Sequence, residues 1–170
     1  TVELHPVFEE SFIMVFPRDF REPLDINGVP SSLPFIRFSR LTGTGQQIER
    51  QIVRMKLKLP QMVEVESSHQ QLALVAAGIG WTITTPVCLA AVPELLPELR
   101  AEPMTRGRFS RAIQVVARMD ELGDIPQRTA TLCQKVLREK TFPPLIAEYP
   151  WMAQQLSWPA PTLDGEEMIA

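Results

Sequence analysis

The chain has little of what several classes of protein require. It contains only two cysteines, Cys88 and Cys133, and neither belongs to a C-x-x-C pair, so the sequence indicates neither a disulfide framework nor a zinc site. Its two histidines, His5 and His69, lie far apart in the sequence. We therefore expect two buried, reduced thiols, no metal ion and no cofactor.

Positive charge is also scarce. The 17 lysines and arginines are outnumbered by 20 aspartates and glutamates, which gives a net charge of −3 and a pI near 5.5. Non-specific binding to nucleic acid needs an excess of positive charge, because its affinity comes from neutralising phosphates. This chain by itself is therefore not expected to bind DNA.

Long apolar runs are missing as well. Every apolar stretch is interrupted by Thr, Gly, Pro or a charge well before the roughly 20 residues that a membrane span requires, and no signal-peptide pattern opens the chain. With 45% hydrophobic and 22% charged residues, the 170 residues have the composition of one globular domain or of two small lobes. We expect a cytosolic protein with no membrane partner.

The sequence does contain an alternation of strand and helix patterns. Short apolar runs rich in β-branched and aromatic residues predict four strands, at residues 12–16, 35–38, 63–66 and 80–85. Helical patterns follow the last three of them, at residues 44–57, 68–77 and 86–92. This alternation predicts a parallel sheet with right-handed connections and helices on both faces.

The predicted helices carry start signals. Ser68 and Gln71 have the spacing of a capping box, and Thr85 followed by Pro86 can cap and open a short helix. Asp124 can cap a last helix, which follows strands near 99–104 and 109–118. The apolar spacing of this helix predicts an inward stripe of Ile125, Thr129, Leu132, Cys133 and Val136.

Hydroxyl side chains follow three of the predicted strands. In open α/β sheets, ligands bind outside the carboxyl ends of the strands, where loops precede helix N-termini. Hydroxyls and unpaired backbone N–H groups at such ends suit a small anion, although each hydroxyl could equally be an ordinary helix cap. Convergence of the three strand ends favours a binding site, to which Arg40 would add positive charge. The candidate binding residues are Ser39, Arg40, Thr42, Gly43, Thr44, Ser68, Thr84, Thr85 and Pro86.

The loop around Gly43 and Gly45 does not match the familiar nucleotide-binding motifs, and the sequence contains no familiar catalytic motif. Gly43-x-Gly45 would need a third Gly or Ala at the position of Ile48, and no Gly-Lys-Ser/Thr follows, so both the dinucleotide fingerprint and the P-loop are excluded. There is no G-x-S-x-G elbow and no pair of carboxylates at a shared strand end. We therefore predict no catalytic residue and no enzyme activity.

Three segments resemble the effector-binding domain of LysR-type transcriptional regulators. They are residues 35–45, residues 65–68 and residues 72–86, of which the piece from Leu74 to Gly80 with the later Pro86 is the most specific. Residues 7–17 resemble the family's crossing strand into its second lobe, and residues 109–138 resemble the return to the first. The resemblance covers about residues 2–139.

The resemblance implies an α/β, periplasmic-binding-protein-like fold with two lobes. Residues 17–103 would form a complete effector-binding lobe II, and residues 1–16 and 104–140 a partial lobe I. The composition of residues 141–170, rich in Pro and Trp, predicts a tail outside the domain that either packs through Tyr149, Trp151 and Trp158 or is mobile. The family holds a small-molecule inducer in the cleft between its lobes. By this resemblance, Ser39, Thr42 and Thr44 would lie on the second-lobe wall, beside the turn from Thr84 to Pro86.

The same resemblance implies partners. The chain would be the effector-sensing domain of a homodimer or homotetramer, whose conformation on DNA is controlled by an organic carboxylate or another small anion. DNA would be bound only through an N-terminal helix-turn-helix that this chain does not contain, and the start at Thr1 in place of Met suggests a fragment of a longer polypeptide.

Two other functions are compatible with the same predicted fold and anion-binding loop. A solute-binding protein of a transporter has the same fold and cleft, but it would need an export signal. An enzyme that uses the anion-binding loop is the second alternative, and an assay for hydrolase or transferase turnover would test it. The upstream coding sequence tests the regulator, because a regulator of this family requires a helix-turn-helix there.

Overall fold

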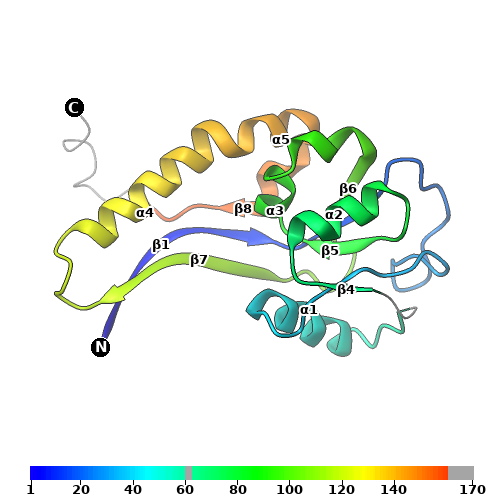
Figure 1. Cartoon of the computed structure of the whole chain (residues 1–170), viewed down its shortest axis with the longest axis horizontal. Helices are drawn as coiled ribbons and strands as arrows, with labels where there is room; N and C mark the ends of the chain where they lie inside the picture. Colours follow the sequence, from blue (N-terminus) through cyan, green and yellow to red (C-terminus); the bar gives the residue numbers. More distant parts are fainter. Residues whose placement is uncertain (60–62, 161–170) are drawn as a thin grey trace. The chain divides into compact units, whose positions relative to one another are not determined.

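The computed structural model describes residues 1–59 and 63–160 and forms two compact units (Figure 1). Unit 1 comprises residues 1–10 and the chain from residue 110 onward, and unit 2 comprises residues 11–109. Among the described residues, no helix has both the length and the apolar character that crossing a membrane requires.

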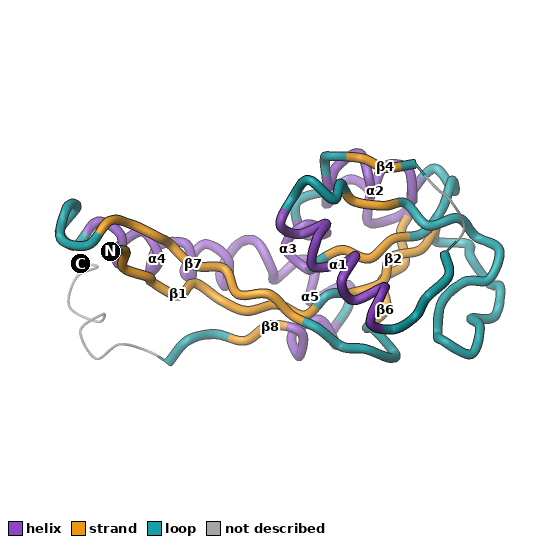
Figure 2. The backbone as a smooth tube through the Cα atoms, turned by 90° about the horizontal axis from the view of Figure 1, so that it is seen from below, coloured by secondary structure: helices purple, strands orange, loops and turns teal. Residues whose placement is uncertain are grey.

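Unit 2 contains a mixed sheet (Figure 2). Its strands are β2 (Ile13–Pro17), β3 (Arg37–Phe38), β4 (Glu64–Val65), β5 (Thr82–Thr84) and β6 (Leu99–Pro103). β3 and β4 are parallel, and a parallel bridge between Phe35 and Trp81 joins them to β5. β2 pairs antiparallel with both β5 and β6.

The prediction of a wholly parallel sheet is therefore wrong for β2. The strands that helices connect, β3, β4 and β5, are parallel as predicted. A parallel neighbour needs a crossover that returns the chain to the same end of the sheet. β2 is followed instead by the loop from residue 18 to residue 36, which contains no helix.

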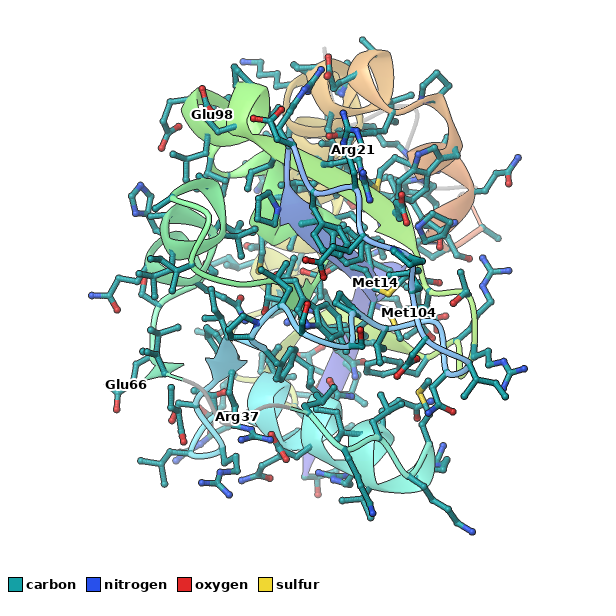
Figure 3. The ribbon with its side chains drawn as sticks, turned by 90° about the vertical axis from the view of Figure 1, so that its right-hand side faces the viewer. Met14, Arg21, Arg37, Glu66, Glu98 and Met104 are labelled. Atoms are coloured by element: carbon teal, nitrogen blue, oxygen red, sulfur yellow. The ribbon has the colours of Figure 1, made fainter. Side chains whose placement is uncertain are left out.

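Aromatic side chains fill the core of unit 2. Trp81 is completely buried, and its ring centroid lies 5.8 Å from that of Phe16 and 5.0 Å from that of Phe35. Figure 3 shows Met14 and Met104 in this interior, where both belong to the same buried cluster. The helices around the sheet are α1 (Gly43–Arg54), α2 (Ser68–Ala76), α3 (Pro86–Ala90) and the 3₁₀ helix η1 (Pro93–Glu98).

The chain enters and leaves unit 2 at neighbouring points. The N–H of Phe12 donates to the carbonyl of Phe109 at 2.9 Å, and the two rings stack with their centroids 4.1 Å apart. β2 pairs with β6 along its whole length and with β5 over Ile13 to Val15. These contacts explain why the units divide at residues 10/11 and 109/110. The lobe bounds that the family resemblance implies, 17–103 for lobe II, stay a prediction.

Unit 1 is a three-stranded sheet with helices. Its strands are β1 (Val2–Ser11), β7 (Ser110–Arg118) and β8 (Leu156–Ser157), in the order β7-β1-β8. Figures 1 and 2 both show β1 and β7 side by side. α4 (Ile125–Val136) packs on β7 and continues through a π-helical turn, η2 (Leu137–Thr141), into α5 (Phe142–Glu148).

α4 presents a different face to the sheet from the one that its apolar spacing predicts. Pro126 and Ala130 are buried, whereas Ile125, Leu132 and Val136 are exposed. Small side chains allow a helix to approach a sheet closely, and this contact decides the orientation of α4. Asp124 is the N-cap residue of α4 and Pro126 lies in its first turn, as predicted, but the Asp124 side chain makes no capping hydrogen bond.

Residues 141–160, expected to form a tail outside the domain, fold onto unit 1. Phe142, Leu145 and Met152 are at most 1% exposed. After the 3₁₀ helix η3 (Pro150–Gln155), β8 pairs antiparallel with β1, with Ser157 opposite Glu9. The remaining residues of the expected tail, 161–170, lie outside the described residues.

Candidate functional site

The carboxyl ends of three strands lie along one edge of the unit 2 sheet. Phe38 is opposite Val65 in the parallel pair of β3 and β4, and the parallel bridge of Phe35 to Trp81 gives β5 the same direction. α1, α2 and α3 begin shortly after these strands. Their first backbone N–H groups therefore point toward the same edge, as the sequence predicts.

The loop between β3 and α1 uses its hydroxyl groups to hold its own turn. The Ser39 Oγ accepts a hydrogen bond from the N–H of Leu41 at 3.2 Å. The Thr42 Oγ1 donates to the Ser39 carbonyl at 2.8 Å and accepts from the N–H of Gly45 at 3.0 Å. Thr42 is thus the N-cap of α1, and Ser39 is buried beneath it.

Gly45 allows α1 to approach this loop closely. A Cβ atom at position 45 would lie 1.9 Å from the carbonyl oxygen of Ser39, whereas a Cβ at Gly43 would meet nothing within 4 Å. The two glycines therefore have different roles. Gly45 is required by packing against backbone, and Gly43 lies open in the first turn of the helix.

Arg40 is paired with a carboxylate at this edge. Glu64 Oε1 accepts from the backbone N–H of Arg40 at 3.1 Å, and Glu64 Oε2 lies 3.4 Å from the guanidinium. Because the backbone N–H of Arg40 and then its charge favour the ionised form, the pKa of Glu64 is lowered from its usual 4.5. Arg37 forms a similar ion pair with Glu49 of α1.

We expect Glu64 to contribute to stability only above acidic pH. A carboxyl whose pKa is lower in the folded than in the unfolded chain stabilises the fold above the unfolded pKa, and this stabilisation is lost as the pH falls through the folded value. NMR titration of the Glu64 side chain should give a midpoint below 4.5. In Arg40→Ala the midpoint should rise only slightly, since the backbone N–H remains. A midpoint at or above 4.5 in the folded protein would contradict this account.

The second strand end is capped by a different residue from the one predicted. Ser67, not Ser68, is the N-cap of α2 and accepts from the N–H of Gln70. Gln71 does not complete a capping box, because its amide nitrogen donates to the Thr82 Oγ1 at 2.5 Å instead. Ser68 lies half-buried in the first turn of the helix.

The buried Gln71 amide is a feature that sequence reasoning missed. The Thr82 Oγ1 in turn donates to the Ile36 carbonyl at 2.7 Å. A buried chain of hydrogen bonds therefore joins α2, β5 and the residue that precedes β3. α2 begins with four polar residues, Ser68 to Gln71, and nothing in that run marks Gln71 as the buried one. This network holds α2 against the strands whose ends carry the candidate residues.

At the third strand end, the candidate residues are mostly buried. Thr84 is 3% exposed, Thr85 is fully buried and Pro86 is the buried first residue of α3. His69 is exposed in the first turn of α2, with its Nε2 3.2 Å from Glu94. Among residues 1–59 and 63–160, no group of three or more metal-ligating side chains occurs, and both cysteines are half-buried rather than buried as expected.

Comparison with known families decides which fold this is. A family profile described as the LysR substrate binding domain matches residues 1–138. The chain belongs to this LysR family. The periplasmic-binding-protein-like α/β fold predicted from the sequence is thereby confirmed.

Solved structures of LysR-type regulators have the same fold at low sequence identity. A cysteine mutant of OxyR from Corynebacterium glutamicum is 20% identical, with a TM-score of 0.66 over 86% of this chain and 47% of that one. The regulatory domain of CcmR from Synechocystis, in complex with 2-PG, is 15% identical, with a TM-score of 0.65 over 82% of this chain and 68% of that one.

A third match is the effector-binding domain of QuiR in complex with shikimate. It is 13% identical, with a TM-score of 0.59 over 78% of this chain and 63% of that one. This LysR domain thus spans between about half and two thirds of the length of these three matched chains. Comparison with the curated proteins gives no match.

Proposed function

We propose that this LysR domain senses a small anionic effector at the edge of unit 2 where α1, α2 and α3 begin. The parallel register of β3, β4 and β5 carries the proposal, because it directs the first turns of three helices toward one edge. Helix N-termini attract anions through their unpaired N–H groups and their partial positive charge. The family match supports effector sensing as the role of the domain.

The candidate residues take two roles in this proposal. Gly43 and Thr44 of α1 and Ser68 of α2 belong to first turns that are at least partly accessible, and their amides and hydroxyls would contact the effector. Arg40, which is exposed and paired with Glu64, would add charge when an anion competes for it. The buried or capping residues would fix the loops that carry these groups: Ser39, Thr42, Thr84, Thr85 and Pro86.

Related domains suggest probes for this site. QuiR was solved with shikimate and CcmR with 2-PG. Shikimate has a carboxylate and ring hydroxyls, which match a site of helix amides and hydroxyl groups. In the intact regulator, unit 2 would be lobe II and unit 1 part of lobe I, and the effector would alter the conformation of an oligomer bound to DNA.

NMR titration of the ¹⁵N-labelled chain with shikimate and with 2-PG tests the proposal. We expect the backbone amides of residues 43–45, 68–70 and 85–88 to shift with at least one probe. Methyl shikimate, which lacks the negative charge, should cause weaker shifts at the same amides. Shifts confined to other residues, equal binding of the ester, or no shift with either anion at millimolar concentration would overturn the proposal.

Thr42→Ala adds a second test, with Thr129→Ala in α4 of unit 1 as its control. The Thr42 hydroxyl caps α1 by accepting a backbone N–H, so its removal should cost about 1 kcal/mol of stability in urea unfolding. It should also weaken binding of the shifting probe, by several-fold, because it loosens the loop that carries Gly43 and Thr44. The Thr129 hydroxyl donates to the Ile125 carbonyl and belongs to no proposed binding residue, so Thr129→Ala should leave binding unchanged. Equal effects of the two variants on binding would leave Thr42 with a capping role alone.

A further inference from the structure

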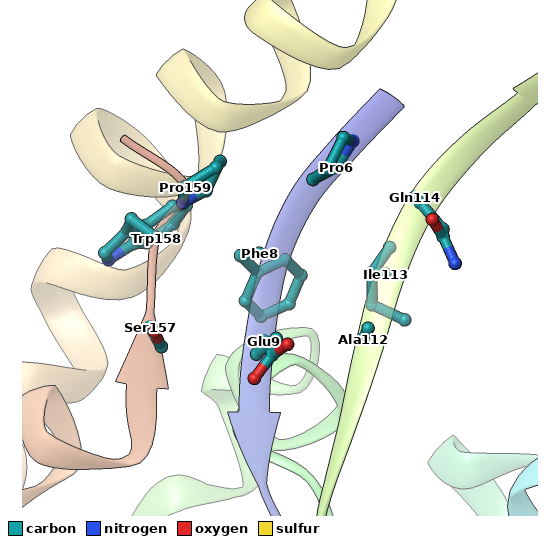
Figure 4. Close-up of a pocket in the computed structure, with 9 residues that line it drawn as sticks. All are labelled: Pro6, Phe8, Glu9, Ala112, Ile113, Gln114, Ser157, Trp158 and Pro159. Carbon is teal, nitrogen blue, oxygen red and sulfur yellow. The ribbon is translucent and has the colours of Figure 1, made fainter. Parts of the chain in front are cut away.

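The charges of the chain are divided unequally between its two units. Unit 1 carries six lysines and arginines against 11 aspartates and glutamates, whereas unit 2 carries 11 against nine. Figure 4 shows a cavity on the unit 1 sheet, and of the nine residues that line it, Glu9 is the only one with a charge. The net charge of −3 therefore conceals a unit 2 in which positive charge is in excess.

The excess is concentrated at the C-terminal end of α1. Residues 50–58 contain four cationic side chains and no carboxylate, and residues 105–109 contain two more, again with no carboxylate. All six side chains are exposed. This end lies about 16 Å along the helix from the first turn that is proposed to contact the effector. We call the six residues the basic surface: Arg50, Arg54, Lys56, Lys58, Arg106 and Arg108.

Two contacts bring these two segments together. The Gln51 Nε2 donates to the Gly107 carbonyl at 2.6 Å. A Cβ atom at Gly107, whose φ is +61°, would lie 2.4 Å from the Met55 Sδ, so the loop lies directly on the end of α1. Arg106 and Arg108 flank Gly107 and therefore lie beside the cations of the helix.

Most cations of the basic surface are not neutralised within the protein. Among residues 1–59 and 63–160, five of the six form no ion pair, the sixth being Arg108. Glu49, the nearest carboxylate in the sequence, is already paired with Arg37. Arg50 and Arg54 are four residues apart on one helix, where like charges repel. The concentration of charge therefore opposes folding slightly and leaves the cations available to a partner.

Lys56 occupies a position where glycine would suit the fold better. Its φ is +55°, in the left-handed region. It closes α1, because its N–H donates to the Val53 carbonyl at 3.0 Å and that of Leu57 donates to the Ile52 carbonyl at 3.1 Å. Glycine is the usual residue in this turn, since a side chain there is strained. Arg54 already supplies a cation to the last turn. A strained lysine on an exposed surface indicates a role outside the fold.

An apolar side chain lies among these cations. Val53 is 73% exposed, and on a helix it neighbours Arg50, three residues earlier, and Arg54. A nucleic-acid backbone presents phosphates and sugars and has no apolar side chain to cover a valine. A peptide can present carboxylates and an apolar side chain together. The mixed character of the surface therefore favours a protein partner over DNA.

We propose that the basic surface binds an acidic peptide segment of a partner protein, one that carries an apolar side chain among its carboxylates. The carboxylates pair with Arg50, Arg54 and Lys56. The apolar side chain covers Val53, and the two loop arginines extend the attraction beyond the helix. This surface is opposite in charge to the partner and separate from the effector-binding edge, so the domain would bind a protein and an effector at different places.

NMR titration of the ¹⁵N-labelled full chain with the end-blocked peptide EEELEEE tests the proposal. We expect the amides of residues 50–58 and 105–109 to shift, and the affinity to fall as salt is added, because exposed charges are screened. The peptide QQQLQQQ should cause no shift, and EEESEEE, which lacks the apolar side chain, should bind more weakly at the same amides.

Several outcomes of this titration would overturn the proposal. They are equal binding of either control peptide, shifts confined to unit 1, and no shift at millimolar EEELEEE. Tighter binding of a short DNA duplex at the same amides would assign the surface to nucleic acid instead. Movement of these amides on raising the protein concentration alone would assign it to a second copy of the chain.

A double variant tests the contribution of the helix arginines. Arg50→Gln combined with Arg54→Gln should weaken binding of EEELEEE by roughly five-fold, since each exposed ion pair contributes little. The matched control combines Arg118→Gln with Arg128→Gln, two exposed arginines of unit 1, and should leave binding unchanged. Equal binding to the two double variants would contradict pairing at α1.

Lys56→Gly separates docking from folding. It should raise the urea midpoint, because glycine relieves the left-handed backbone, and yet weaken binding of EEELEEE by about two-fold. Asp120→Gly is the control, since Asp120 is an exposed residue of unit 1 with a φ of +62°. It should also raise the midpoint but leave peptide binding unchanged. A lower midpoint for Lys56→Gly, or unchanged peptide binding, would show that this lysine serves the fold and would overturn its role in docking.

Discussion

Replacing Gly45 by alanine is expected to destabilise unit 2 by about 3 kcal/mol, because the new methyl group would overlap the backbone of the preceding loop. The added Cβ would lie 1.9 Å from the Ser39 carbonyl oxygen and 2.9 Å from that of Phe38. Backbone atoms cannot rotate away as a flexible side chain can. α1 must therefore separate from the loop, which also lengthens the capping hydrogen bond from Gly45 to Thr42.

Gly43→Ala is the matched control for this substitution. It lies two residues earlier in the same helical turn, and a Cβ there meets nothing within 4 Å. Its stability should stay within about 0.5 kcal/mol of the wild type in urea unfolding. Similar losses for the two variants would show that the effect comes from the general cost of replacing glycine and not from contact with Ser39.

The second large effect is expected in unit 1, at a buried ion pair between β1 and β7. Glu10 is completely buried, and its Oε2 lies 2.9 Å from both the Nε and an Nη of Arg111. Arg111→Met removes this partner and leaves a carboxylate in the interior. Breaking a buried pair from one side costs roughly 3 kcal/mol or more, which we expect to find as a loss of stability in chemical denaturation.

Two further variants distinguish this explanation from a simple loss of packing. Combining Arg111→Met with Glu10→Met should recover part of the lost stability, since no charge then remains buried. Arg118→Met, on the same strand, removes an exposed arginine paired with Glu121 at 3.6 Å and should cost less than about 0.5 kcal/mol. A double variant that is no more stable than Arg111→Met would contradict the proposed cause.

Local patterns predicted the order of elements around the site. The runs ending at Phe38, Val65 and Thr84 are strands, and helices follow each of them, because apolar periodicity and glycine or proline boundaries are properties of short segments. The family resemblance rested on the same segments and is confirmed by the match over residues 1–138. The binding roles of the candidate residues stay a prediction.

What failed depends on contacts between distant segments. Whether Ser67 or Ser68 caps α2 cannot be read from a run of two serines. The capping box predicted for Ser68 and Gln71 does not form, because the Gln71 amide donates to Thr82, a residue on another element. The orientation of α4 likewise follows from its packing on β7, where Ala130 is buried and Leu132 is not. Residues 141–160 gave no repeating pattern, since their burial comes from a few aromatic contacts such as that of Trp158 with Phe8.

The neighbouring entry and exit of unit 2 also bear on how this domain can be rearranged. Residues 11–109 are one uninterrupted stretch of chain, and the hydrogen bond and stacked rings of Phe12 and Phe109 join its two ends. A segment with adjoining ends can be exchanged between homologues as a single cassette, or closed by a short linker and reopened elsewhere, without crossing its own core. Recombination could therefore replace the whole of unit 2 while unit 1 keeps its own sequence.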